Sequence, residues 1–115
     1  MEEFAGMEII EDSSEEQVNA RTKTGTINWT VGNNTTRYTG GFKVSAGGKI
    51  MVSASITPSN KTVKVGIVKP DGKTSYINGK GFVSHIFSVS KTGTYKVFVS
   101  NASGKKITVS GSFIR

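Results

Sequence analysis

Apolar and polar residues alternate along most of the chain after residue 24. The clearest run is residues 50–57, where apolar residues occupy the even-numbered positions up to Ile56. Successive side chains of a β-strand point to opposite faces, so this period of two predicts a strand with one buried face. The same pattern predicts strands in residues 26–31, 38–44, 62–67, 74–78, 82–89, 95–99 and 107–113.

Turn residues separate these runs. Pro70-Asp71-Gly72 is the strongest signal, because proline presets the first central position of a turn and glycine accepts a positive φ. Gly40-Gly41 interrupts the run at 38–44, where we expect a bulge or a close approach of the backbone. The turns therefore divide the chain into short strands and leave no room for a long helix.

About eight short strands at this spacing are typical of a sandwich or barrel. We predict an all-β fold, with a single-domain antiparallel β-sandwich over residues 24–115. Eight strands favour a jelly roll, and an immunoglobulin-like Greek key is the alternative. In a jelly roll, strands 1, 8, 3 and 6 would form one sheet, and strands 2, 7, 4 and 5 the other.

Charge divides the chain sharply. Residues 1–16 hold seven of the eight acidic residues and no Lys or Arg. All fifteen basic residues lie from Arg21 onward with Asp71 as the one acid, so residues 17–115 carry fifteen minus one, or +14. We expect residues 1–23 to form an acidic arm that is partly disordered or forms a short helix over 14–18, where Ser13 and Glu16 fit a capping box.

Three roles remain open for this arm. It can be a solvated tail, a leader or prosegment that is removed later, or a segment that folds against the basic body. In the last case it would compete with an anionic partner, since opposite charges attract and are screened over about 8–10 Å at physiological salt.

Composition indicates the compartment. Cysteine is absent, which excludes disulfides and thiolate metal sites. No run of about 18 apolar residues occurs, and residues 1–12 do not have the form of a signal peptide. The abundance of Ser, Thr, Gly and Asn favours a secreted or cell-surface bacterial protein whose signal peptide is absent from this sequence.

Two segments resemble a known family. The segment Val68-Lys69-Pro70-Asp71-Gly72-Lys73 is followed by residues 87–99, which contain Thr92-Gly93-Thr94-Tyr95 and a valine-rich strand. Over about residues 42–113 the chain thereby resembles bacterial pre-peptidase C-terminal domains, which are jelly-roll-like sandwiches on secreted peptidases. The resemblance implies an extracellular, non-catalytic accessory or binding role. Some members bind calcium through an acidic N-terminal segment, which makes Glu8, Glu11, Asp12, Glu15 and Glu16 candidate ligands here; apart from calcium, we expect no cofactor.

Residues for catalysis are scarce in the basic body. Asp71 is its one carboxylate, whereas a glycosidase needs two and a hard cation needs several oxygen ligands. His85 is the one histidine of the chain, and a nucleophile and its base need an orienting partner. We therefore predict that the protein is not an enzyme and that His85 lies near a strand end with its ring partly covered.

The assumed jelly-roll order predicts a binding surface. It places Lys43, Lys64 and Lys96 on the outer face of three neighbouring strands, as a stripe of lysines. Lysines also guard exposed sheets against aggregation, so a purely protective role is the alternative. Arg37, Tyr76 and Phe98 complete the candidate ligand-binding set, and Trp29 is expected in the core because it alternates with Ile27 and Val31. The other sheet would present a flat face of Ser and Thr residues.

Two classes of function follow. The first is a non-catalytic extracellular binding or accessory module whose basic face binds an anionic polymer or a cell-surface glycan, with a protein partner also open. The second is a structural, self-assembling surface or matrix protein. Nucleic acid is an unfavoured partner, because such a face would interleave several exposed aromatic and basic residues and only Phe98 and Tyr76 are candidates.

Overall fold

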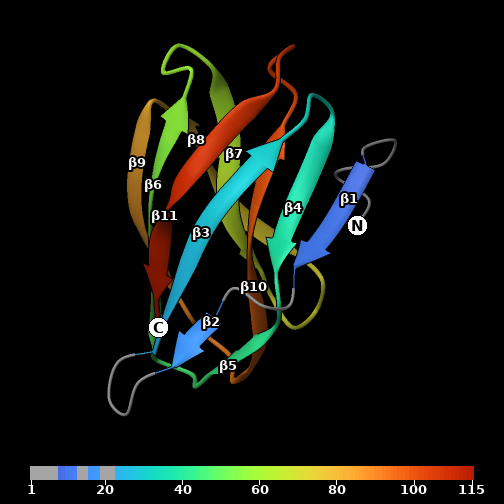
Figure 1. Cartoon of the computed structure of the whole chain (residues 1–115). Coiled ribbons are helices and arrows are strands. Elements are labelled where there is room, and N and C mark those ends of the chain that lie inside the picture. The colour runs from blue at the N-terminus through green and yellow to red at the C-terminus, as the bar shows by residue number, and fades with distance from the viewer. Residues whose placement is uncertain (1–7, 13–15, 19–22) are drawn as a thin grey trace.

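The computed structural model describes residues 8–12, 16–18 and 23–115, and these residues form strands and turns without a helix (Figure 1). The strands are β1 (Glu8–Asp12), β2 (Glu16–Val18), β3 (Lys23–Val31), β4 (Thr35–Thr39), β5 (Phe42–Val44), β6 (Lys49–Thr57), β7 (Thr62–Val68), β8 (Thr74–Lys80), β9 (Phe82–Ser88), β10 (Gly93–Asn101) and β11 (Ile107–Ile114). The prediction of an all-β domain is confirmed. Nothing in the described residues has the length and apolar character of a membrane-spanning helix.

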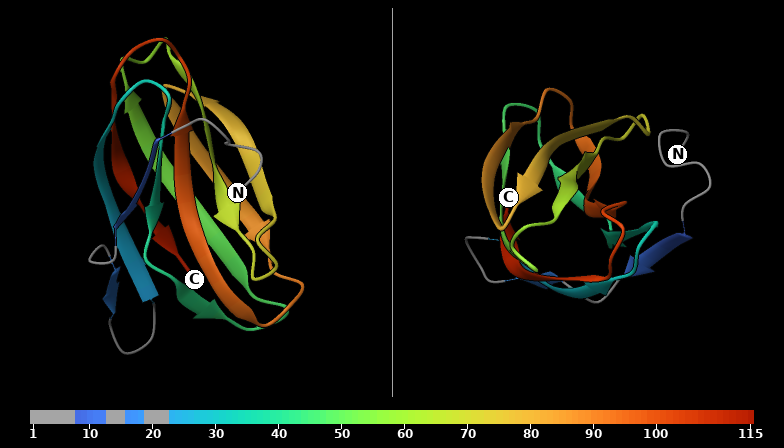
Figure 2. Two further views of the ribbon diagram at one scale, coloured as in Figure 1. Left: turned by 90° about the vertical axis from the view of Figure 1, so that its right-hand side faces the viewer. Right: turned by 90° about the horizontal axis from the view of Figure 1, so that it is seen from above.

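The strands form two sheets that face each other across the core (Figure 2). Sheet I has the order β1-β4-β10-β7-β8, and β5 also pairs with β10; sheet II has the order β2-β3-β11-β6-β9. Pairing is antiparallel throughout, apart from the parallel pair of β1 and β4. Without β1 and β2, these are the two strand orders expected of a jelly roll, so that topology is confirmed over the immunoglobulin-like alternative.

The strand predicted over 38–44 is divided in two. The break falls at Gly40-Gly41, and both halves, β4 and β5, pair with β10. At the break the Thr39 hydroxyl accepts a hydrogen bond from the backbone N–H of Val97 at 3.0 Å. A side chain therefore satisfies a donor of β10 where the strand-to-strand ladder is interrupted.

The core lies between the sheets and follows the predicted alternation. In β6 every even-numbered residue from Ile50 to Ile56 is buried. Trp29 is 2 % exposed, so its predicted place in the core is confirmed. The core contains Ile27, Trp29, Val31, Phe42, Val44, Ile50, Val52, Ala54, Ile56, Val63, Val65, Ile67, Val83, Phe87, Val89, Tyr95, Val97, Val99, Ile107, Val109 and Phe113.

Asn101 closes one end of the sandwich. Its buried amide nitrogen donates to the carbonyl oxygens of Val31, Gly32 and Lys105 at 2.7–3.1 Å, and its Oδ1 accepts from the backbone N–H of Ser103. One side chain thus connects the end of β3 to the loop between β10 and β11. It supplies a donor to the buried carbonyl group of Val31 and to two partly buried carbonyl groups beside it.

The N-terminal segment adds strands to the sandwich. β1 runs beside β4 with Glu8 in register with Thr35, and β2 pairs with β3 with Glu16 in register with Gly25. The helix predicted over residues 14–18 is therefore wrong for Glu16–Val18, and residues 14–15 lie outside the described residues. The residues that favour a helix cap do not decide the structure of this segment. A short isolated helix is only marginally stable, whereas the edge of a sheet offers hydrogen-bond partners to a segment that pairs with it as a strand.

Candidate functional site

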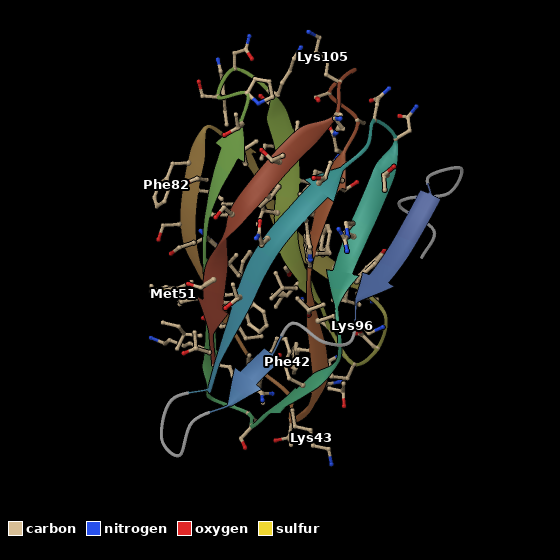
Figure 3. All side chains as sticks on the ribbon, in the orientation of Figure 1. Phe42, Lys43, Met51, Phe82, Lys96 and Lys105 are labelled. Atoms are coloured by element: carbon tan, nitrogen blue, oxygen red, sulfur yellow. The ribbon has the colours of Figure 1, made fainter. Side chains whose placement is uncertain are left out.

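The three lysines of the predicted stripe lie on the outer face of sheet I. Lys43 of β5 is in register with Thr94, and Lys96 of β10 is in register with Val68. Lys64 of β7 is in register with Ser100, which lies on the same face of β10 as Lys96. The stripe therefore crosses three adjacent strands. Figure 3 labels Lys43 at the lower end of the molecule and Lys96 at its right-hand side.

Aromatic residues cross the same face in a single row. Tyr38 of β4 is in register with Phe98 of β10, Phe98 with Gly66 of β7, and Gly66 with Tyr76 of β8. The ring centroids of Phe98 and Tyr38 are 6.0 Å apart, and those of Phe98 and Tyr76 are 6.4 Å apart in an edge-on arrangement. The two rings can meet across β7 because Gly66 places no side chain between them. We call Tyr38, Phe98, Gly66 and Tyr76 the aromatic row.

Two lysines flank the aromatic row on opposite sides. The Lys64 ammonium lies 5.5 Å from the ring centroid of Tyr76, and the Lys96 ammonium lies 5.9 Å from that of Tyr38. Cations at this distance are attracted by the negative face of the ring, with a contribution of about 0.5–1 kcal/mol at exposed sites. The rings therefore hold the two ammonium groups over the sheet.

Phe98 is not an exposed platform. Its alternation with Val97 and Val99 directs it to the outer face, but the residue is 0 % exposed, whereas Tyr76 is 41 % exposed. The expectation that Phe98 would contact a ligand is therefore wrong for this structure. Phe98 instead supports the neighbouring tyrosine rings, and Tyr76 is the accessible aromatic of the row.

Arg37 lies apart from the lysines. It is in register with Val99, a core residue, so it faces the opposite side of β4 from Tyr38. Its guanidinium carbon is 5.3 Å from the ring centroid of Trp29 in sheet II. The structure thus places Arg37 between the sheets and separates it from the predicted binding surface.

Asp71 and His85, the residues considered for catalysis, each contact a residue two positions along the chain. Asp71 accepts a hydrogen bond from the backbone N–H of Lys73 at 3.0 Å within the turn after β7. His85 is exposed at the middle of β9, so its predicted position near a strand end is wrong; its ring packs edge-on against Phe87 with centroids 4.6 Å apart. Asp71 therefore belongs to a turn of sheet I and His85 to a strand of sheet II.

Acidic groups were also candidates for calcium. Within residues 8–12, 16–18 and 23–115, no three His, Asp or Glu residues lie close enough to hold a metal ion. Glu8, Glu11 and Asp12 lie on β1 of sheet I, Glu16 lies on β2 of sheet II, and Glu15 lies outside the described residues. Calcium binding by the acidic segment stays a prediction.

The two segments that carry the family resemblance meet in space. A Cβ atom on Gly93 would lie 2.5 Å from Cγ of Pro70, so the Pro70 turn packs directly on the start of β10. Beside this contact is a hollow of about 110 Å³, lined by Lys69, Pro70, Asp71, Ser90, Lys91 and Tyr95. The Tyr95 hydroxyl donates to the carbonyl oxygen of Lys91 at 2.5 Å, which fixes the loop that forms one wall.

Sheet II carries a surface that the sequence analysis missed. The expected Ser and Thr residues are exposed or partly exposed on its outer face together with Met51, but Phe82 and Ile86 lie there as well. Met51, Phe82 and Ile86 are 37 %, 63 % and 52 % exposed. Figure 3 labels Met51 and Phe82 on the opposite side of the molecule from Lys96. The signal was present: if Val83, His85 and Phe87 face one side of the strand, Phe82 and Ile86 must face the other.

Solved structures share this fold. A periplasmic inhibitor of g-type lysozyme from Aeromonas hydrophila has a TM-score of 0.57 and 16 % identity, and the match covers 96 % of this chain and 100 % of that one. The pre-peptidase C-terminal domain of a Bacillus anthracis collagenase has a TM-score of 0.55 and 16 % identity, with 93 % of each chain covered. No protein-family model and no curated protein matches the sequence.

These similarities concern the fold. The chain is a jelly-roll β-sandwich, and the predicted resemblance to pre-peptidase C-terminal domains is confirmed at the level of the fold.

Proposed function

We propose that this protein is a non-catalytic binding module of the bacterial cell exterior. Its outer face of sheet I binds an anionic polymer, such as wall teichoic acid or an acidic polysaccharide. The observation that carries the proposal is the placement of the Lys64 and Lys96 ammonium groups over Tyr76 and Tyr38. Ordering a fully mobile lysine side chain costs about 2 kcal/mol in entropy. A ring that already holds the ammonium group reduces the part of this cost that is incurred when an anion binds.

The geometry of the stripe suits a polymer with repeated charges. Lys43 and Lys96 occupy diagonal positions on adjacent strands, which places their Cα atoms roughly 7–8 Å apart. Lys64 is four residues further along the ladder from Lys96, or roughly 14 Å at about 3.4 Å per residue. A flat, extended row of cations contacts successive anionic groups of a chain more readily than it surrounds a single small anion.

The experiment compares two triple variants that change the net charge of the chain by the same amount. The triple variant Lys43→Glu, Lys64→Glu, Lys96→Glu changes the charge by −6, and so does a control triple at Lys49, Lys105 and Lys106, which lie exposed on β6 and in the loop before β11. Both are tested for binding to Gram-positive cell wall and to an acidic polysaccharide across a salt series. We expect the first triple to lose salt-sensitive binding while the control keeps most of it. Equal loss in both would assign the effect to net charge and overturn the proposed site.

Two coarser alternatives have their own support. The neighbour from Aeromonas hydrophila is described as a lysozyme inhibitor, which makes a protein ligand the second class of partner for this fold. A structural, self-assembling role is supported by the exposed apolar residues of sheet II. If the protein binds wall polymer and the Lys43, Lys64, Lys96 triple variant loses that binding, the result favours the proposed function over both alternatives.

A further inference from the structure

One edge of sheet II lacks the usual protection. Among the described strands, β9 is the last of sheet II and pairs on one side with β6. Sheet edges are commonly guarded by lysine, proline or a bulge, because their open backbone groups otherwise pair with other chains. The β9 sequence Phe-Val-Ser-His-Ile-Phe-Ser contains neither lysine, arginine nor proline, although 15 of the 115 residues of the chain are basic.

The register indicates which backbone groups of β9 face the open edge. The Ile56 N–H donates to the Gly81 carbonyl at 2.5 Å, and the following pair is Ser55 with Phe82. Hydrogen-bonded and non-hydrogen-bonded pairs alternate along an antiparallel ladder. Residues 82, 84 and 86 therefore direct their N–H and C=O groups away from β6, while residues 83, 85 and 87 direct theirs toward it.

The same residues present apolar side chains to the outside. Phe82 is 63 % and Ile86 is 52 % exposed, and Ile86 is in register with Met51, which is 37 % exposed. Ser84 lies between them, in register with Ser53, and the two hydroxyl oxygens are 3.3 Å apart. An unpaired backbone edge and an exposed apolar strip thus coincide on one strand.

We propose that β9 is the interface of a symmetric dimer, in which a second copy of the chain adds its own β9 antiparallel to this one. The pattern of the strand is self-complementary about Ser84. A two-fold axis at this residue places Phe82 opposite the partner subunit's Ile86, and Ile86 opposite the partner subunit's Phe82.

Symmetry and charge both favour a second copy as the occupant. The interface is isologous, so each copy supplies both members of the apolar pair. The strip carries no lysine or arginine to attract the anionic polymer proposed for sheet I. The two five-stranded sheets would join into one continuous sheet, and the lysines of sheet I lie on a different sheet from this interface.

The interface is small, so the dimer should be weak. Two exposed apolar side chains from β9 of each copy and one row of backbone hydrogen bonds correspond to a dissociation constant on the order of micromolar or weaker. Sedimentation velocity of the full chain over a concentration series should show reversible monomer–dimer exchange. Ile86→Lys should weaken the dimer about tenfold or more, because it replaces the apolar contact with the partner subunit's Phe82 by a charged side chain that loses water on pairing, and lysine is a residue that guards sheet edges. Ser110→Lys should not weaken the dimer, because Ser110 is exposed on the central strand β11 of the same face.

A cysteine variant tests the register directly. Hydrogen-bonded antiparallel pairs have Cα atoms about 5.5 Å apart, which is within the range of a disulfide. In this cysteine-free chain, Ser84→Cys should form a disulfide-linked dimer roughly tenfold faster than Ser110→Cys in a glutathione buffer at tens of micromolar protein. Circular dichroism of each variant verifies that the fold is retained.

The outcomes are decisive for this proposal and independent of the proposed function. A monomer at all concentrations overturns it, even if another protein were found to pair with β9. A dimer that tolerates Ile86→Lys, or equal cross-linking of both cysteine variants, also overturns it. Loss of polymer binding in the sheet I triple leaves the β9 dimer unaffected.

Discussion

Gly93 lies against Pro70, at a distance that leaves no space for a side chain. A Cβ atom at position 93 would lie 2.5 Å from Cγ and 2.9 Å from Cβ of the proline. The contact joins the turn after β7 to the first residue of β10. It gives a physical reason why a Pro-Asp-Gly turn and a Thr-Gly-Thr-Tyr segment occur together in this sequence.

The first prediction concerns this contact. Gly93→Ala should lower the free energy of unfolding by about 1–3 kcal/mol, because the added methyl group forces the proline turn away from β10. Urea denaturation followed by Trp29 fluorescence measures the change. In a Pro70→Ala background the same substitution should cost less; an undiminished cost would show that the strain lies elsewhere.

The second prediction concerns Asn101. Asn101→Ala should lower the free energy of unfolding by about 2–4 kcal/mol, because it removes the Asn101 donor from the buried Val31 carbonyl and the partly buried Gly32 carbonyl and also removes the Oδ1 acceptor of Ser103. Asn78→Ala on the exposed face of β8 is the matched control and should change stability by less than about 0.5 kcal/mol. Thermal unfolding of the two variants makes the comparison, and equal melting temperatures would contradict the role given to Asn101.

The third prediction concerns the aromatic row. Gly66→Val would place a branched side chain on β7 where the backbone of β8 passes close by, since even a Cβ atom would lie 2.6 Å from Cα of Tyr76. We expect a loss of more than about 3 kcal/mol, at the upper end for overpacking substitutions. Near-ultraviolet circular dichroism should also change as the Tyr76 and Phe98 rings separate. An unaltered aromatic signal would contradict the close packing of these rings.

The fourth prediction concerns the N-terminal segment. We expect a chain that starts at Gln17 to bind polyanions more tightly than the full chain, because it loses seven negative charges. It should also be less stable, because it lacks β1 and the pairing of Glu16 with Gly25. A chain that starts at Glu8 keeps both strands and loses Glu2 and Glu3, so it tests the charge effect without removing a described strand. Salt-dependent binding and melting temperature of the three chains separate the two effects, and tighter binding by neither truncation would contradict a masking arm.

Much of the fold followed from the sequence because alternation has a direct physical meaning in strands. Ile50 to Ile56 alternate in burial as they alternate in polarity, and Trp29 lies in the core with Ile27 and Val31. The jelly-roll order placed Lys43, Lys64 and Lys96 on one face, and the observed registers agree. Whether these lysines bind a ligand stays a prediction.

Other features depended on contacts that no local pattern contains. The segment around Glu16 has the capping residues of a helix, yet it pairs with β3 because an open sheet edge lies beside it. Nothing in the sequence around Arg37 distinguishes it from the other basic residues on strands. Its position over the Trp29 ring arises because β4 packs against the opposite sheet. These positions are decided by which strands become neighbours.

The sequence by itself determined the strands, the turns and the face to which each residue of a strand points, because side-chain direction along a strand depends on the backbone of that strand alone. Only the tertiary structure decided which outward-facing residues remain accessible. Phe98 and Phe82 both point away from the core by alternation, yet Phe98 is buried between tyrosines brought by β4 and β8, while Phe82 lies on an edge strand and stays exposed. Accessibility depends on strands that are distant in the chain, so it arises when the sheets assemble.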